Sequence, residues 1–337
     1  MANLFKKAAI FTDLHFGAKS NSDGHNQDCL EFMQWFIEQA KLEGCETCLF
    51  LGDYHNNRNS MNLRTMSYAI RGLELLSQNF EHTYFIPGNH DLFFKDKRDV
   101  HSVDWAKHIP NVTIVNDWFN AGDVIIAPWL VGDDYKRVKK LSGKYMFGHF
   151  ELPSFYMNAM IQMPDHGEIS RKDFAGIEHC FSGHFHKRQT QGNITYIGNA
   201  FPHNYADAWD DERGMTILEW GKEPVFRSWH DAPKFRTLKL SQLLDDADNI
   251  IKSKMYMRVA IDLPISFEEA SFIKENFVSQ GLVRELTLIS ENKELDSTSD
   301  FNVERFESID QIVSNQIANI QSDNYDPKIL LAIYNNL

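Results

Sequence analysis

The chain has 337 residues, of which 43% are hydrophobic and 13% aromatic, enough for one large domain and a smaller one. No apolar run approaches the roughly 18 residues of a membrane-spanning helix, and Thr12 and Asp13 follow the start too soon for a signal peptide. A soluble, cytoplasmic protein without a membrane partner is therefore expected. The formal charge of −13 excludes broad, non-specific binding to polyanions, so a nucleic-acid ligand would need a local basic patch or metal ions.

Strands and helices alternate in the first part of the sequence. Apolar runs that end in polar turns predict strands at 7–12, 47–51 and 83–86. Apolar residues at helical spacing predict helices at about 26–43, with Asn26 as a candidate cap, and at 61–79. This alternation predicts a largely parallel sheet that is covered on both faces. Ligands of such sheets lie beyond the carboxyl ends of the strands.

Short strands with little room for helices between them follow, at 112–115, 123–127, 144–147, 178–181, 194–197, 215–220 and 224–229. They predict a second sheet, mixed or antiparallel. Two sheets packed face to face with helices outside give the predicted fold class, α/β, in the form of a four-layer α/β/β/α sandwich.

The C-terminal part is organised separately. A hinge bracketed by prolines divides a main domain at 1–232 from a small α+β domain at 233–291. A polar linker at 292–304 leads to a helix-loop-helix segment at 305–337 that has two apolar stripes. The stripes predict an arm that binds a partner. The alternative is a pair of helices that fold back on the main domain.

Clusters of polar residues follow five of the predicted strands, and four of the clusters carry a glycine just before the polar group. They are Asp13-Leu14-His15, Gly52-Asp53, Gly88-Asn89-His90-Asp91, Gly148-His149 and Gly183-His184-Phe185-His186. Carboxylate, imidazole and amide groups without thiolate suit Mn²⁺, Fe or Zn²⁺ in a hydrolytic site. A lone histidine of this kind is more often a satisfied, partly buried side chain, but five clusters at one sheet edge argue against that reading. Seven ligands are too many for one ion and suit two ions that share a bridging carboxylate.

The order of these motifs (DxH, GD, GNHD, GH and GHxH) resembles that of the calcineurin-like metallophosphoesterases, over about residues 7 to 200. The resemblance implies the four-layer sandwich and two divalent metal ions, with Mn²⁺ expected. It also implies the ligands: Asp13, His15 and His186 for the first metal, Asn89, His149 and His184 for the second, and Asp53 as the bridge.

Three further residues have roles in this interpretation. The two metals activate a hydroxide for in-line attack on the phosphodiester. His90, which is not a ligand in the family pattern, assists the leaving group, and Asp91 orients its imidazole. His55 is a candidate second histidine over the substrate.

The substrate class follows from a narrower resemblance, to the double-strand-break repair nucleases. It is carried by the stretch 52–60, by the segment 196–214 and by the three-part layout, and it is strongest toward the recombination endonuclease subunits of T-even-like bacteriophages. The loop 52–60 is one residue shorter than the family's and lacks its proline, which puts His55 in doubt. Candidate DNA contacts are Arg58, Lys95, Lys97 and Arg98.

The narrower resemblance implies a metal-dependent DNA nuclease, both exonuclease and single-strand endonuclease, that processes DNA ends in recombination and double-strand-break repair. It would act in the host cytoplasm if phage-encoded. The α+β domain would cap the DNA, the C-terminal helices would bind an SMC-like ABC-type ATPase, and helix 61–79 is a candidate surface for a homodimer. One alternative is a phosphomonoesterase or small-nucleotide phosphodiesterase of the same superfamily; another is a metal-free scaffold that only docks the ATPase.

Overall fold

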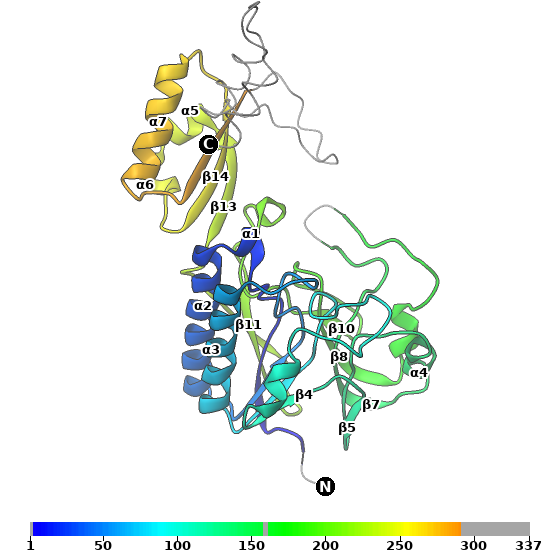
Figure 1. Cartoon of the computed structure of the whole chain (residues 1–337). Coiled ribbons are helices and arrows are strands. Elements are labelled where there is room, and N and C mark those ends of the chain that lie inside the picture. The colour runs from blue at the N-terminus through cyan, green and yellow to red at the C-terminus, as the bar shows by residue number, and fades with distance from the viewer. Residues whose placement is uncertain (1–2, 158–160, 291–337) are drawn as a thin grey trace, which may run out of the picture. The chain divides into compact units, whose positions relative to one another are not determined.

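A six-stranded sheet in the first part of the chain carries three of the five polar clusters (Figure 1). Its strand order is β12 (Val225–Ser228), β11 (Gly214–Glu219), β1 (Lys7–Phe11), β2 (Thr47–Phe50), β3 (His82–Phe85) and β4 (Val112–Ile114). Strands β1 to β4 pair in parallel, whereas β11 pairs antiparallel with both β1 and β12. The computed structural model describes residues 3–157 and 161–290, and the chain divides into two compact units after Pro233.

Strands β4, β11 and β12 correct one prediction, because the sequence placed all three in the second sheet. Strand β11 is buried along almost its whole length. Its Met215 and Ile217 join the core beneath the helices, and Leu218 joins the core between the sheets. A strand that is apolar on both faces needs a layer on each side, and the free edge of β1 provides that position.

The second sheet carries the remaining two clusters. Its strand order is β5 (Phe119–Ala121), β6 (Val124–Ile126), β7 (Gly143–His149), β8 (Ile177–Gly183), β10 (Ile194–Tyr196) and β9 (Gln189–Gln191). The four inner strands are parallel, and the edge strands β5 and β9 are antiparallel. The sequence analysis missed both edge strands, which are only three residues long and partly polar.

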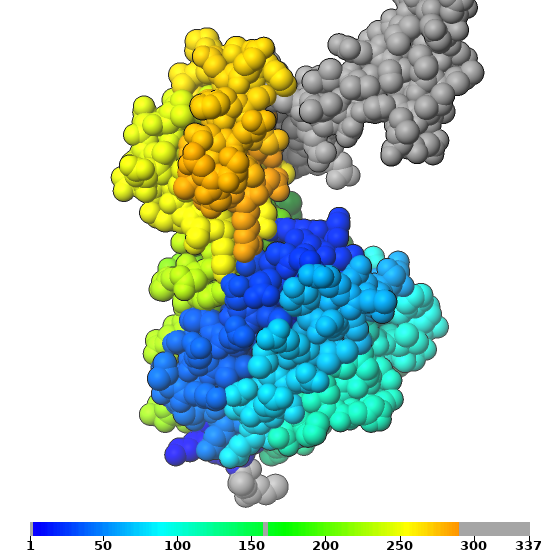
Figure 2. All heavy atoms as spheres, turned by 60° about the vertical axis from the view of Figure 1, so that its left-hand side comes forward, coloured from blue at the N-terminus to red at the C-terminus, as the bar shows by residue number. Residues whose placement is uncertain are grey.

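The two sheets pack face to face around an apolar layer that includes Ile10, Leu49, Phe147 and Phe181. Helices α2 (Asp23–Leu42) and α3 (Leu63–Asn79) lie side by side and cover the outer face of the first sheet; they form much of the surface in Figure 2. The outer face of the second sheet is covered by α4 (Asp134–Val138), the 3₁₀ turn η2 (Arg171–Phe174) and loops. The predicted α/β four-layer sandwich is confirmed.

The start of α2 differs from the prediction. Ser22, not Asn26, caps the helix, with its hydroxyl accepting the N–H of His25. Asn26 is buried instead, where it accepts the N–H of Gly17 and donates to Thr65 of α3. Its amide therefore ties the loop after β1 to two helices. Three other short elements are α1 (Ala18–Asn21), η1 (Asp104–His108) and η3 (Tyr205–Asp207).

The second unit begins at Lys234 and has its own core. Parallel strands β13 (Lys234–Lys239), β14 (Met255–Ile261) and β15 (Glu285–Ser290) form a sheet that packs against α5 (Leu240–Asp245) and α7 (Phe267–Ser279). Asp246 separates α5 from α6 (Ala247–Ile250). The predicted linker at 292–304 and helical segment at 305–337 lie outside the described residues. Within 3–157 and 161–290, no helix is long and apolar enough to cross a membrane.

Candidate dimetal centre

The five polar clusters come together where strands β1, β2, β3, β7 and β8 end. Three overlapping groups of side chains have candidate ligand atoms within 4.8 Å of one another. The groups are Asp53 with His149 and His184, Asp53 with His15 and His90, and His15 with His186 and His203. The shared members link all three groups into one centre, and the ligand roles of its members stay predictions.

Asp13, His15 and His186 form one half of the centre. The carboxylate oxygen Oδ1 of Asp13 lies 3.8 Å from Nε2 of His15 and 3.9 Å from Nε2 of His186. In the described part of the chain, Oδ1 of Asp13 and both ring nitrogens of His15 are buried without a hydrogen-bond partner. Unsatisfied buried polar atoms are costly, and a cation held between Oδ1 of Asp13 and Nε2 of His15 would satisfy these two atoms. This half therefore fits a divalent ion.

Asn89, His149 and His184 form the other half. The Oδ1 atom of Asn89 lies 3.0 Å from Nδ1 of His184 and 3.1 Å from Nε2 of His149. The other ring nitrogen of His149, Nδ1, donates to the carbonyl of Leu51 at 2.6 Å. This bond uses Nδ1, so Nε2 is the His149 atom that faces Asn89 and is available to a metal ion. This half therefore also fits a divalent ion.

Asp53 lies between the two halves. Its Oδ2 atom is 3.7 Å from Nε2 of His15 and 3.4 Å from Nε2 of His149, which is where a bridging carboxylate has to be. Burial opposes the charge of Asp53, but His149 holds the pKa of this carboxyl well below its usual range. Burial likewise lowers the pKa of His149, but Asp53 more than offsets it and raises that pKa to about 9. Without metal, a proton on His149 compensates the negative charge of the centre.

Backbone strain is concentrated at the centre. Asp13, His15, Asp53 and His184 have positive φ angles of 54°, 53°, 59° and 88°. Each such conformation costs on the order of 1–3 kcal/mol for a residue other than glycine and is retained mainly at functional sites. The strain aims these side chains into the centre from strand ends that would otherwise continue straight.

Two of the motif glycines are required by close approach. A Cβ atom at Gly88 would lie 2.2 Å from Oδ1 of Asp53, and one at Gly52 would lie 2.4 Å from Nδ1 of His149. Neither position has room for a side chain. The glycines in these motifs therefore allow neighbouring clusters to meet.

The contact predicted between Asp91 and His90 is wrong. Nδ1 of His90 lies 2.9 Å from the carbonyl of Asn56, which holds the ring so that Nε2 can face the centre. Asp91 is fully buried and accepts the backbone N–H groups of Gly88, Tyr54 and His55 at 2.8 to 3.0 Å. A carboxylate gains more from three amide donors in a buried loop than from a partly exposed imidazole. Asp91 thus joins two loops of the centre.

His55 does not line the centre in this structure. Its side chain is fully buried, and its Nδ1 atom lies 2.7 Å from the hydroxyl of Ser102. Its Nδ1 atom is therefore engaged by Ser102 and not directed at a substrate. The residue that the resemblance placed over the substrate is therefore buried beside Ser102.

The four candidate DNA contacts differ in their surroundings. Arg58 is part-buried and donates to the carbonyl of Asn89 at 2.8 Å, so its guanidinium lies beside the second half of the centre. Lys95 and Lys97 are exposed. Arg98 is largely buried and forms an ion pair with Asp134, which makes it a structural residue and not a free DNA contact.

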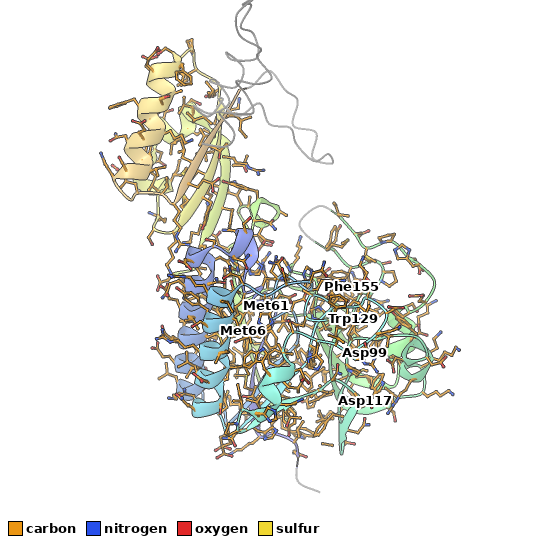
Figure 3. The ribbon with its side chains drawn as sticks, in the orientation of Figure 1. Met61, Met66, Asp99, Asp117, Trp129 and Phe155 are labelled. Carbon is orange, nitrogen blue, oxygen red and sulfur yellow. The ribbon has the colours of Figure 1, made fainter. Side chains whose placement is uncertain are left out.

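Sequence reasoning missed His203 and Trp129. His203 lies beside His15 and His186; it follows the turn after β10, and no glycine-polar motif marks it. Trp129, labelled in Figure 3, packs its ring against His149 and His184 with centroid distances of 5.8 and 5.5 Å. The one signal in the sequence that could have pointed to Trp129 is its position just after the strand predicted at 123–127.

Comparisons with known proteins bear on what this centre does. No protein-family model matches the chain. Over 232 residues the chain is 25% identical to "Exonuclease subunit 1" of Enterobacteria phage T4, covering 65% of this chain and 67% of that protein. The chain resembles a phage exonuclease subunit. This confirms the resemblance predicted from the motifs, and with it the prediction of a hydrolase that acts on phosphoester bonds.

Similar solved structures include a dimetal phosphatase from Danio rerio, with 10% identity and a TM-score of 0.43 over 67% of this chain and 96% of that chain. The nuclease MPE from Pseudomonas putida has 16% identity and a TM-score of 0.29 over 56% of this chain and 66% of that chain. Similarities of this size do not distinguish a nuclease from a phosphatase.

Proposed function

We propose that this protein is a metal-dependent DNA nuclease, with both exonuclease and single-strand endonuclease activity, that processes DNA ends in recombination and double-strand-break repair. The observation that carries the proposal is the centre itself. Carboxylate, amide and imidazole groups from five strand ends converge there, and several of their buried atoms have no partner in the residues described.

Two divalent ions, with Mn²⁺ proposed, would supply Lewis acidity and a nucleophilic water for in-line displacement at phosphorus. Asp13, His15 and His186 would hold one ion, Asn89, His149 and His184 the other, and Asp53 both. His90 would act on the leaving oxygen. Its Nδ1 is held by the Asn56 carbonyl, so Nε2 is free to carry the proton that the leaving group needs.

Residues beside the centre favour a nucleic acid over a small phosphoester. The Arg58 guanidinium, held by the Asn89 carbonyl, has further N–H groups for a phosphate oxygen. Phe93 and Phe94 are 44% and 39% exposed, with ring centroids 4.8 Å apart, and Lys97 lies over the Phe94 ring. Exposed aromatic rings beside cations are what single-stranded nucleic acids use for stacking and phosphate contact. Arg58, Lys95 and Lys97 are the cationic side chains proposed to hold phosphate here, which a chain of charge −13 needs in order to bind DNA.

A protein partner is part of the proposal. The similar phage protein is named as a subunit, and the apolar stripes at 305–337 support a docking arm for an SMC-like ABC-type ATPase. The small α+β unit would contact DNA as a cap. A homodimer through α3 is supported by Leu63, which is 88% exposed at the start of that helix.

The decisive experiment is a side-by-side assay with Mn²⁺, using single-stranded DNA and an aryl phosphate, with and without the ATPase. Cleavage of DNA but not of the aryl phosphate is expected. The reverse result would establish the alternative, a phosphomonoesterase or small-nucleotide phosphodiesterase. His90→Ala should abolish DNA cleavage and leave the bound metal, measured by elemental analysis, unchanged. Wild-type cleavage by this variant would show that the role given to His90 is wrong.

A further inference from the structure

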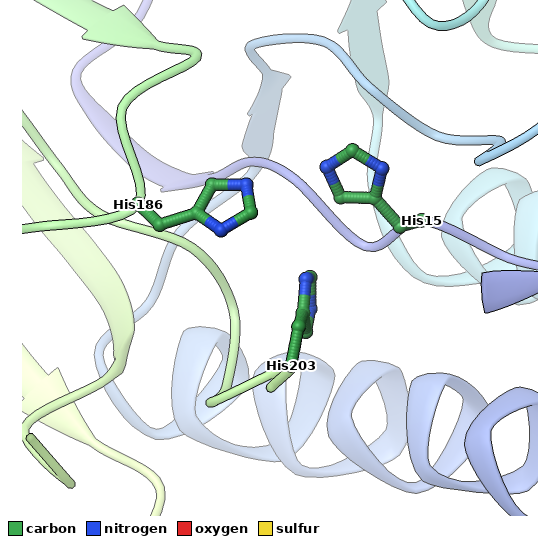
Figure 4. A group of neighbouring side chains, drawn as sticks. All are labelled: His15, His186 and His203. Atoms are coloured by element: carbon green, nitrogen blue, oxygen red, sulfur yellow. The ribbon is translucent and has the colours of Figure 1, made fainter. Parts of the chain in front are cut away.

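A histidine outside the five motifs points into the centre. His203 lies in the loop between β10 and β11, and Figure 4 shows its ring together with those of His15 and His186. Its ring centroid is 5.3 Å from that of His15 and 5.2 Å from that of His186. One ligand atom from each of the three rings lies within 4.8 Å of the other two. A single ion with bonds of about 2.0–2.1 Å to imidazole nitrogen would need only a small side-chain adjustment to bind all three.

The Nε2 atom of His203 makes no hydrogen bond within the described part of the chain. The side chain is 6% exposed. The N–H group at Nε2 of the neighbouring His25 is not available to His203, because it donates to the carbonyls of His15 and Leu14 at 3.0 and 3.2 Å. Leaving a buried polar atom unpaired costs on the order of 1–3 kcal/mol. An ion at this position would remove that cost.

A buried network holds the loop that carries His203. The backbone N–H of His203 donates to Oδ2 of Asp207 at 2.9 Å, and Asp207 forms an ion pair with Arg213 at 3.4 Å. Arg213 also donates to Oδ1 of Asn199 at 2.6 Å. All of these side chains are buried, and networks of this kind fix a position because each member is costly to leave unpaired. The loop is therefore held with His203 turned toward the centre.

We infer that His203 is a further ligand of the first metal, beside His15 and His186. With Asp13 and the bridging Asp53, five protein groups then surround the first position, against four at the second. Three imidazoles make Zn²⁺ or Fe²⁺ bind the first position more tightly than Mn²⁺, which stays the ion proposed to support cleavage. The second position, with fewer protein ligands, is the one left more open to a phosphate oxygen. The inference depends on the metal centre and not on which phosphoester is cleaved.

The test is metal binding to the full-length chain after removal of metal with a chelator. Titration calorimetry with Mn²⁺ and with Zn²⁺ should give two classes of site in the wild type. His203→Ala should weaken one class by at least the roughly 10- to 100-fold that loss of even an outer partner of a metal ligand costs, and should leave the other class unchanged. The matched control is His82→Ala, since His82 is a part-buried histidine that contacts Thr113 of β4; it should keep both affinities.

Two further measurements keep the inference falsifiable. His203→Asn retains a polar side chain if the alanine variant folds poorly, and it should show the same selective loss. In the wild type, the first equivalent of Zn²⁺ should shift the ¹⁵N resonances of the His15, His186 and His203 rings together. Unchanged affinities in both variants, or a His203 resonance that does not move, would refute the ligand role. DNA cleavage lost with both affinities intact would refute it too, by making His203 a substrate contact, and would leave the proposed nuclease function standing.

Discussion

Asp91→Asn separates the structural role of this carboxylate from a role in catalysis. Oδ2 of Asp91 accepts the N–H groups of Gly88 and Tyr54, and Oδ1 accepts that of His55. The asparagine side chain has one acceptor oxygen. Two of the three backbone N–H groups would then donate to this neutral oxygen, and the third would face the amide N–H₂ group. The change from charged to neutral acceptor costs about 1 kcal/mol for each of two bonds, and the unpaired donor about 2 kcal/mol. A neutral amide is cheaper to bury, so a net loss of about 3 kcal/mol is expected.

The assay is urea denaturation with chelator present, so that metal binding does not contribute. His90→Ala is the matched control: the ring of this neighbouring residue is part-buried, and within 3–157 and 161–290 its one hydrogen bond is to the Asn56 carbonyl. It should lose less than about 1 kcal/mol of stability. If Asp91→Asn also lost less than about 1 kcal/mol but abolished cleavage, the carboxylate would act through His90 after all. The contact-based reasoning would then be refuted.

Three more predictions concern packing, pH and the C-terminal segment. Gly88→Ala should displace the Asp53 carboxylate and abolish metal binding by calorimetry, whereas Gly24→Ala, which meets only a Ser22 oxygen at 3.6 Å, should bind metal normally. Burial lowers the pKa of His25 from 6.5 to about 3, so below pH 6.5 only the unfolded chain takes up this proton. Stability then falls by up to about 1.4 kcal/mol per pH unit down to about pH 3, and His25→Gln should remove this part of the slope in urea titrations with chelator. Deletion of 305–337 should abolish ATPase binding in gel filtration and spare Mn²⁺-dependent cleavage; a truncated chain that still binds would place the contact elsewhere.

Strand ends explain why so much of the centre could be predicted from sequence. An apolar run that stops at Asp13 or Gly52 marks both a buried strand and the residue at its carboxyl end. Parallel strands bring such ends to one edge, so listing the strands also lists the side chains that converge. The parallel order β1 to β3 follows from the same alternation of strand and helix.

Hydrogen-bond partners could not be predicted in this way. Asp91 follows His90 directly, and adjacency suggested that the two act together. In the structure, the Asp91 carboxylate accepts hydrogen bonds from the backbone N–H groups of Tyr54 and His55, which lie 37 and 36 residues earlier in the chain. The same loop buries His55. Both outcomes depend on how the two loops pack against each other, which the local pattern of residues does not show.

The fold class, the five clusters and the class of chemistry could be predicted from sequence, because each depends on local patterns of apolar and polar residues. Three features are visible only in the folded chain: β11 pairs with β1 in the first sheet, Arg98 forms an ion pair with Asp134, and His203 faces His15. These contacts join segments distant in the chain, and they depend on register, loop packing and buried charge. No pattern within one segment carries that information.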